Sequence, residues 1–349
     1  MPTSAPSPSN SGSTAKDPAA PIPESTTGTP GGTRLKRLVR PLIVLVVAAF
    51  LISTIVGAIQ SIRSGSSGLD GEITPRQLMM LTFAMVTYGL GLLPAGWVLQ
   101  SACGRIQSRP PIQLALIAQI VGHLGKYVPG KAMVIVLRHN ILKQHGLRAS
   151  STTLAIVCET LLMMACGSTV AAAICVTLPL PSWIRMTAVA TSFGCLATVS
   201  PPIFGRVLRF VRDRKFGDEK ELFSDAEHSL SWSHFLHDVF LSTIAWLLMG
   251  GSFWFVLQSL PTSTTDIPYS IALAALSLSF VLGFASLIPG GAGVRESVLI
   301  AILSLSAPPA TALVAAALMR IISLFVECVM AGTALAWSRR LQRENGSRV

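Results

Sequence analysis

The chain has 349 residues, of which 51% are hydrophobic and only 12% are charged. Soluble domains carry about 25% charged residues, so this composition excludes an ordinary soluble protein and favours a membrane protein. The formal net charge of +11 does not indicate nucleic acid, because the basic residues flank apolar runs and no nucleic-acid-binding motif is present.

The N-terminal segment differs in composition from the rest of the chain. Residues 1–33 are rich in Pro, Ser, Thr, Gly and Ala and contain no aromatic residue. Such a segment buries too little apolar surface to offset its conformational entropy, so we expect a disordered tail. Positive charge before the first apolar run predicts a cytoplasmic N-terminus; the basic residues are Arg34, Lys36, Arg37 and Arg40.

Several apolar runs approach or exceed the ~20 helical residues that cross a bilayer. They occupy residues 41–60, 77–99, 151–177, 183–204, 234–257 and 311–337. Because backbone amides must be paired inside a bilayer, the sequence predicts an all-α membrane protein with about six transmembrane helices. Basic residues place the loop 205–231 and the tail 341–349 in the cytoplasm. We therefore expect a polytopic membrane domain at 34–340 in a bacterial-type inner membrane.

Two further apolar segments are interrupted by proline and glycine. The first, from residue 112, runs into Gly-Lys-Tyr-Val-Pro-Gly-Lys at 125–131. The second, from residue 271, runs into Ile-Pro-Gly-Gly-Ala-Gly-Val-Arg-Glu at 288–296. Pairs of short broken helices are typical of re-entrant hairpins. Charge bias places them on opposite sides of the membrane, which predicts an inverted repeat with halves at about 34–180 and 181–340.

The cations near the first break are Lys126, Lys131 and Arg138. A charge within a membrane costs about 3 kcal/mol or more unless it faces a cavity or a partner. Because Arg and Lys both bind phosphate, the sequence predicts a basic pocket for a phosphate head group. The alternative is a shallow hairpin whose cations extend to the lipid head groups.

The second break offers a site of another kind. Gly290, Gly291 and Gly293 leave backbone amides accessible, and Arg295 adds a positive charge at the start of a helix. Backbone amides and positive charge together predict an anion site, in which Glu296 would orient Arg295 or accept a proton. The alternative is an ordinary glycine-rich turn between two short helices.

Other charged residues lie within the predicted spans, namely Glu159, Arg320 and Glu327. Arg320 and Glu327 are seven residues apart and so share a helix face. Glu159 and Arg320 follow their breaks at similar offsets with opposite charge, which predicts a pair between the two halves. We interpret these residues, with Glu296, as a gate whose ion pairs break and reform, or as a proton relay; the alternative is a static structural network.

Two other patterns carry less weight. The first break resembles a nucleotide-binding loop, but Ala132 replaces the hydroxyl residue that binds magnesium. His234, His237 and Asp238 have ligand-like spacing without an evident third ligand, so we interpret them as a polar helix start. The cysteines form no Cys-x-x-Cys pair, and we expect neither a metal nor a cofactor.

The broken segments carry a family resemblance. The chain resembles the flippase-like family named after the transmembrane region of lysylphosphatidylglycerol synthase over about residues 35–340. The resemblance rests on the sequence at 126–131, Arg138, Glu159, the sequence at 289–296 and Arg320, although Ala292 stands where the family more often has leucine. It implies a polytopic membrane fold and movement of lipid head groups. The lysine transfer of the bifunctional synthases needs a separate soluble domain, for which we find no long enough segment, so we do not expect that activity.

The sequence therefore favours a flippase-like transporter of an anionic phospholipid or a polyprenyl-phosphate-linked sugar. The cations of the two breaks would hold the phosphate. Without an ATP site, the driving force would be a gradient or the turnover of the lipid. Two alternatives stay open: a membrane-embedded transferase with Glu296 or His123 as its base, and a non-catalytic membrane subunit that supports a glycosyltransferase partner.

Overall fold

The computed structural model describes residues 56, 74–127, 132–177, 182–206, 231–260 and 267–346. The chain divides into two units, Met1–Arg40 and Pro41–Val349, and every described residue belongs to the second. Several predicted features lie outside the described residues: the tail at 1–33, the span 41–60 apart from Val56, Lys131, and nearly all of the loop 205–231. These stay predictions.

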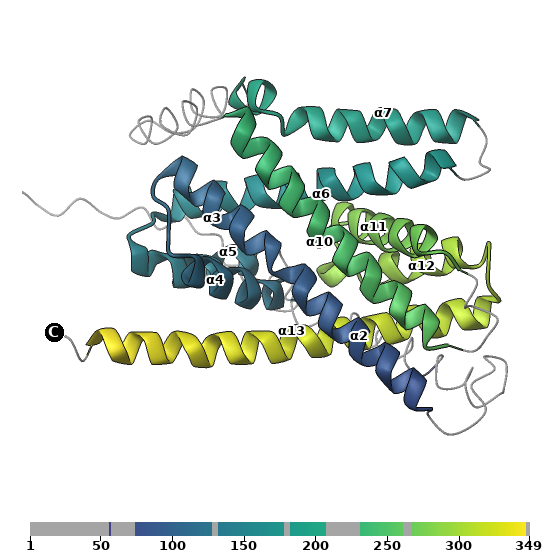
Figure 1. The fold of residues 1–349 in the computed structure, drawn as a ribbon. Helices are drawn as coiled ribbons and strands as arrows, with labels where there is room; N and C mark the ends of the chain where they lie inside the picture. The colour runs from purple at the N-terminus through teal and green to yellow at the C-terminus, as the bar shows by residue number, and fades with distance from the viewer. Residues whose placement is uncertain are drawn as a thin grey trace, which may run out of the picture. The chain divides into compact units, whose positions relative to one another are not determined.

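All regular structure in the described part of the chain is helical, which confirms the all-α prediction (Figure 1). The helices are α2 (Pro75–Leu92), α3 (Pro94–Ile106), α4 (Ile112–Leu124), α5 (Ala132–Leu142), α6 (Ala149–Thr177), α7 (Ser182–Thr198), α10 (Trp232–Gln258), α11 (Tyr269–Ala285), α12 (Val294–Leu303) and α13 (Pro309–Gly346). Short 3₁₀ turns are η1 (Gly125–Tyr127), η2 (Lys143–His145) and η4 (Pro289–Gly291).

Four apolar stretches among the described residues are long enough to cross a membrane. They are Pro75–Ile106, which joins α2 and α3 across Pro94, then α6, α10 and the Pro309–Arg340 part of α13. Each has 27 to 32 residues, whereas about 20 suffice. They correspond to four of the six predicted spans. The predicted span 183–204 is interrupted, because α7 ends after 17 residues and the chain bends at Ser200.

Helix α10 packs against α2, α3, α6, α11 and α13 and so holds the bundle together (Figure 1). Small residues permit this close approach, as is usual between membrane helices. A Cβ on Gly167 of α6 would lie 2.5 Å from the Trp246 ring, and the indole of Trp246 donates a hydrogen bond to the Met163 carbonyl at 2.9 Å. Gly250 likewise accommodates Leu273 of α11.

The two broken segments form pairs of short helices. Helix α4 packs against α5, and α11 packs against α12. Gly122 meets Arg138 and Gly125 meets Val134, so α4 and α5 run antiparallel. Each helix of the two pairs has 10 to 17 residues, too few to cross a bilayer unaided. Entry into the membrane from opposite faces and an inverted repeat stay predictions.

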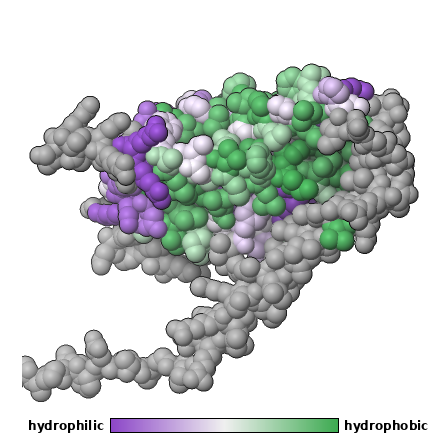
Figure 2. All heavy atoms as spheres, turned by 90° about the horizontal axis from the view of Figure 1, so that it is seen from below, coloured by the Kyte–Doolittle hydropathy of each residue, from purple (hydrophilic) through white to green (hydrophobic). Residues whose placement is uncertain are grey.

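The surface is apolar over wide areas. Hydrophobic residues cover the middle of the face in Figure 2, and hydrophilic residues gather toward its ends. Exposed large apolar side chains occur on most of the long helices, including Phe83 of α2, Phe240 of α10 and Phe325 of α13. An exposed apolar surface of this extent suits contact with lipid rather than water.

Candidate functional site

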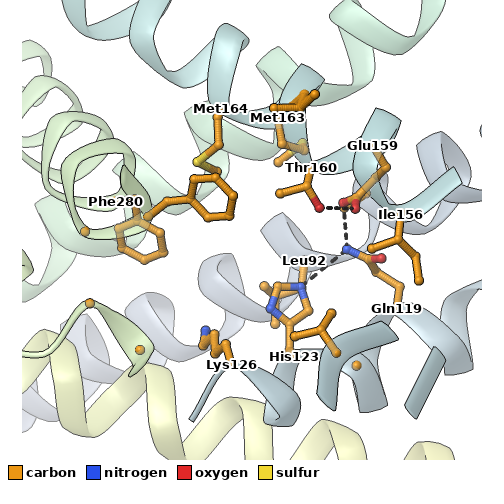
Figure 3. A pocket seen from close by; sticks show the side chains of 18 of the residues that line it. Leu92, Gln119, His123, Lys126, Ile156, Glu159, Thr160, Met163, Met164 and Phe280 are labelled. Atoms are coloured by element: carbon orange, nitrogen blue, oxygen red, sulfur yellow. Dashed lines mark hydrogen bonds between the residues drawn. The ribbon is translucent and has the colours of Figure 1, made fainter. Parts of the chain in front are cut away.

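A cavity of about 330 Å³ lies between the two helix breaks and helices α2, α6 and α10 (Figure 3). We call it the central cavity. Its walls are mainly apolar and include Met163, Met164, Trp246, Phe280 and Phe284. Its charged lining residues come from both breaks and from α6: Lys126, Arg138, Glu159 and Arg295. Lys126 and Arg295, 169 positions apart in the sequence, therefore contribute charge to the same cavity.

The rim of the central cavity is apolar. Val157 and Leu161 of α6 are 41% and 42% exposed, and Leu287 and Ile288 before η4 are 72% and 39% exposed. The other lining residues in the described part of the chain are buried or half-buried. We call these four residues the apolar rim. The cavity thus opens beside side chains that are suited to lipid chains.

The two breaks touch each other at η1 and η4. Gly290, Gly291 and Gly293 have φ values of 61°, 64° and 86°, a left-handed conformation that glycine adopts without steric cost. A Cβ on Gly290 would lie 3.1 Å from the ring of Tyr127 and 3.1 Å from Arg320 Nη2. Glycine in the second break therefore lets the first break and α13 come close.

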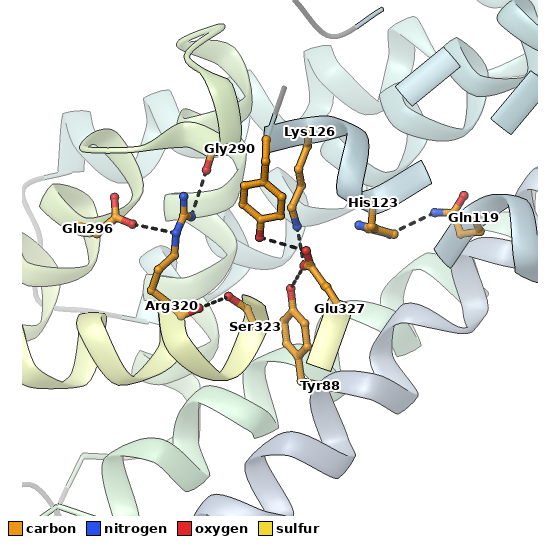
Figure 4. A network of polar contacts seen from close by, with 10 residues as sticks. Tyr88, Gln119, His123, Lys126, Gly290, Glu296, Arg320, Ser323 and Glu327 are labelled. Carbon is orange, nitrogen blue, oxygen red and sulfur yellow. Dashed lines mark hydrogen bonds and ion pairs between the residues drawn. The ribbon is translucent and has the colours of Figure 1, made fainter. Parts of the chain in front are cut away.

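A buried carboxylate of α13 holds the first break. Glu327 is 1% exposed and accepts hydrogen bonds from Lys126 Nζ at 2.5 Å, the Tyr88 hydroxyl at 2.6 Å and the Tyr127 hydroxyl at 3.0 Å (Figure 4). We call these four residues the Glu327 cluster. Such a charge is tolerated in a membrane only when it is paired and hydrogen-bonded, as it is here.

A second residue of α13 holds the second break. Arg320 Nη1 donates to the Gly290 carbonyl at 3.0 Å, and Arg320 Nε lies 3.6 Å from Glu296 Oε1 (Figure 4). Glu296 also accepts a hydrogen bond from the Gly293 amide at 2.8 Å, which caps α12. The contacts of Glu296 thus go to Arg320 and the turn, and not to Arg295 as the sequence suggested.

The first hairpin contains its own ion pair. Arg138 Nη1 lies 2.8 Å from Glu159 Oε2, and both residues are 4% exposed. The Gln119 amide donates to Glu159 Oε1 at 3.0 Å (Figure 3). The predicted pair between Glu159 and Arg320 is therefore wrong, because each already has an opposite charge close by in its own half of the chain.

Arg295 is placed differently from the other cations. It is 6% exposed, and its guanidinium carbon lies 3.4 Å from the centre of the Phe280 ring. Its side-chain carbons occupy space above Gly283 and Gly291, where a Cβ on either glycine would collide with them. Arg138 lies over Gly122 in the same way, so in both hairpins an arginine of the second helix packs on a glycine of the first.

One known family matches most of the chain. The family described as "Lysylphosphatidylglycerol synthase TM region" matches residues 37–330. The chain belongs to this family. No curated protein matches the chain.

Membership of the lysylphosphatidylglycerol synthase TM family confirms the resemblance seen in the sequence. With the four long apolar helices it also establishes a multi-pass membrane protein. The cytoplasmic placement of both termini and the inner membrane as its location stay predictions.

The structure brings most of the predicted residues of this family member to one region. Lys126, Arg138, Glu159, Gly290, Gly291 and Arg295 line the central cavity. Gly293, Glu296, Arg320 and Glu327 lie next to them in the contacts described above. Lys131 lies outside the described residues. No substrate contact is established for any of these residues, so their roles are proposals.

Sequence reasoning gave no role to four residues that the structure places at the site. Tyr88 and Tyr127 bind Glu327, Gln119 binds Glu159, and Phe280 faces Arg295. Tyr88 and Gln119 are polar residues within apolar helices, where an unpaired polar group is costly. A polar residue within an apolar run is therefore a signal in the sequence that could have identified Tyr88 and Gln119. Phe280 carries no such signal, because it is one of many aromatic residues in the spans.

The histidine pattern near the start of α10 serves a structural purpose. Asp238 is fully buried, and its carboxylate lies 2.7 Å from Arg105 Nη1 of α3 and 3.3 Å from His237 Nδ1. Across the described ranges, no group of three or more His, Cys, Asp or Glu side chains is placed to hold a metal. These contacts give Asp238 a structural partner, and the interpretation of the pattern as a polar helix start stays a prediction.

Proposed function

We propose that this protein is a flippase-like transporter that moves an anionic phospholipid or a polyprenyl-phosphate-linked sugar between the leaflets of a membrane. One observation carries the proposal: buried cations line a cavity whose walls and rim are apolar. A soluble anion would make no favourable contact with an apolar rim, and an apolar molecule would leave the buried arginines without an anion. A lipid with a charged head group uses both.

The dimensions of the central cavity support this division of the ligand. Ligand pockets commonly measure about 300–1,000 Å³, so a volume of about 330 Å³ suits a head group and not a whole lipid. The acyl or prenyl chains would leave over the apolar rim between α6 and the second break. By this route the acyl or prenyl chains would stay in the bilayer, and the charged head group would cross through the protein and not through hydrocarbon.

The contacts of α13 suggest the gate. Glu327 binds the first break and Arg320 binds the second, so one helix holds both breaks together beside the cavity. Movement of one hairpin would exchange these ion pairs for others, with Glu159 and Glu296 as the available carboxylates. Exchange of partners avoids the large cost of leaving a buried charge alone.

The proposal is tested by lipid translocation in proteoliposomes. Fluorescent phosphatidylglycerol would be placed in both leaflets and the outer pool reduced with a membrane-impermeant reagent. We expect the wild-type protein to expose the inner pool and Arg295→Ala to abolish this. Arg148→Ala, a change at an exposed residue, is the matched control. Wild-type rates in a well-folded Arg295→Ala protein would end the assignment.

A membrane-embedded transferase is the second candidate, and one observation favours it. His123 lines the central cavity and contacts Gln119 at 3.5 Å, so a potential base faces the site. Glu296, the other proposed base, is engaged by Gly293 and Arg320. Mass spectrometry of supplied lipids tests this candidate, since transfer changes their mass and transport does not. A glycosyltransferase partner stays a prediction that co-purification tests.

A further inference from the structure

The charges around the central cavity do not balance. Among the described residues, the cations at the two breaks are Lys126, which is partly exposed, and the buried Arg138, Arg295 and Arg320; the carboxylates are Glu159, Glu296 and Glu327. Each carboxylate has its own cation: Glu327 lies 2.5 Å from Lys126, Glu159 lies 2.8 Å from Arg138, and Glu296 lies 3.6 Å from Arg320. Among these described residues four cations face three carboxylates, so one of the four has no carboxylate of its own.

The uncompensated charge belongs to Arg295. No carboxylate of the described residues lies within 4 Å of its guanidinium, which sets it apart from Arg138 and Arg320. Its buried Nε has no hydrogen-bond partner, as is also true of the Nε atoms of those two arginines. Its partner in the structure is the face of the Phe280 ring. Cation–π contact offsets only part of the desolvation penalty of a buried charge. Arg295 is only 6% exposed and lines a cavity, and its guanidinium has no carboxylate among the described residues, so it is arranged for a ligand anion.

We infer that the central cavity selects lipids whose head group carries a single negative charge, a phosphodiester, and that Arg295 makes the charged contact. The inference rests on the proposed function for the existence of a lipid site and goes further by naming the charge class and the residue. Lys126 and Arg138, although they line the cavity, are neutralised by their own carboxylates and contribute hydrogen bonds and shape rather than net charge.

Three kinds of head group would change the net charge of the cavity differently: a phosphodiester, a phosphomonoester and a zwitterionic head group. A phosphodiester presents two oxygens that match the planar fork of a guanidinium, and its one charge neutralises the site. A phosphomonoester would bring a second negative charge, and no cation of the described residues is left to meet it. A zwitterionic head group would carry an ammonium into a cavity that already has a surplus positive charge. Each mismatch is costly in a site of low polarity.

Equilibrium binding of lipids to the purified full-length protein tests the inference. Native mass spectrometry in mild detergent would follow titration with phosphatidylglycerol, phosphatidylcholine and, at about pH 8.5, phosphatidic acid, which is then mostly doubly charged. We expect phosphatidylglycerol to bind at least about tenfold more tightly than either other lipid. Soluble glycerophosphoglycerol carries the same phosphodiester without chains and should not displace it; efficient displacement would show a site for free phosphodiesters and overturn the lipid assignment.

Variants separate charge from folding. Arg295→Gln should abolish the preference for phosphatidylglycerol over phosphatidylcholine, Arg295→Lys should retain part of it, and the exposed control Arg148→Gln should bind as the wild type does. Glu159→Gln raises the surplus to two charges and should shift the preference toward phosphatidic acid by about tenfold. This gain of binding cannot come from misfolding. Unchanged preferences in folded Arg295→Gln, or no shift in Glu159→Gln, would overturn the inference.

Failure of this inference can be told apart from failure of the proposed function. Charge-selective binding without translocation in proteoliposomes would leave Arg295 as an anion site and remove the transporter assignment. Translocation of phosphatidylglycerol and phosphatidylcholine at equal rates would leave the transporter and remove the charge selection.

Discussion

Replacing Glu327 with leucine removes the carboxylate on which Lys126, Tyr88 and Tyr127 converge. The change leaves the Lys126 ammonium beside the central cavity with no carboxylate from α13. It also leaves the Tyr88 hydroxyl, in a fully buried residue, without its acceptor. We expect Glu327→Leu to be among the most destabilising single changes in the protein.

The magnitude follows from the burial of the pair. Removing one partner of a buried ion pair costs about 3–5 kcal/mol. The Lys126 side chain is 24% exposed, so water from the cavity can partly solvate it and we expect the lower end of this range. The unsatisfied tyrosine adds about 1–3 kcal/mol. Together the two effects amount to roughly 4–6 kcal/mol. The melting temperature falls by about 2–4 °C for each kcal/mol in chains of 150–250 residues, and the lower value suits this chain of 349 residues, so we expect a decrease of roughly 8–12 °C.

The double variant Lys126→Met/Glu327→Leu gives the decisive comparison. It removes both charges, so only the hydroxyl groups of the two tyrosines stay unsatisfied, and it should recover at least ~2 kcal/mol of the loss. Melting in detergent, followed by the fraction that stays monodisperse on size-exclusion chromatography, would measure all variants. Cys328→Leu, at the exposed neighbouring position, is the control for adding leucine to α13.

The order of melting temperatures decides the outcome. The expected order is wild type and Cys328→Leu highest, the double variant next and Glu327→Leu lowest. A double variant that melts below Glu327→Leu would show that Lys126 is stabilised by groups other than Glu327. The reasoning on the Glu327 cluster would then be refuted.

Two further predictions concern other parts of the structure. Gly290→Ala forces a left-handed residue to carry a Cβ, at ~1–2 kcal/mol, and crowds the ring of Tyr127; it should lower both the melting temperature and lipid translocation. Gly332→Ala, where a Cβ meets open space, should be neutral or slightly stabilising, and an equal effect of the two changes would contradict this reading. Asp238→Ala removes the carboxylate 2.7 Å from Arg105, but that arginine is 17% exposed, so we expect a loss of only ~1–3 kcal/mol. A loss as large as that of Glu327→Leu in the same melting assay would argue against it.

Much of the fold could be predicted from the sequence. Low charge and long apolar runs require helices, since a helix pairs its own backbone amides without help from the rest of the chain. Four predicted spans are accordingly present as long helices. The predicted span 183–204 differs from the structure, because hydropathy reports apolar length and contains no information on the bend at Ser200. The two proline–glycine breaks were found for the same local reason, as these residues end helices wherever they occur.

The position of a charged residue within an apolar run also indicates that its burial is costly and that it needs a partner. The identity of that partner follows from the tertiary structure alone. Lys126 meets Glu327 across 201 positions of the chain, and Glu159 takes Arg138 rather than Arg320. An ion pair depends on a separation of a few ångströms, and sequence distance does not fix that separation. The same is true of Arg295: that it has no carboxylate partner among the described residues follows only from the positions of its neighbours in space.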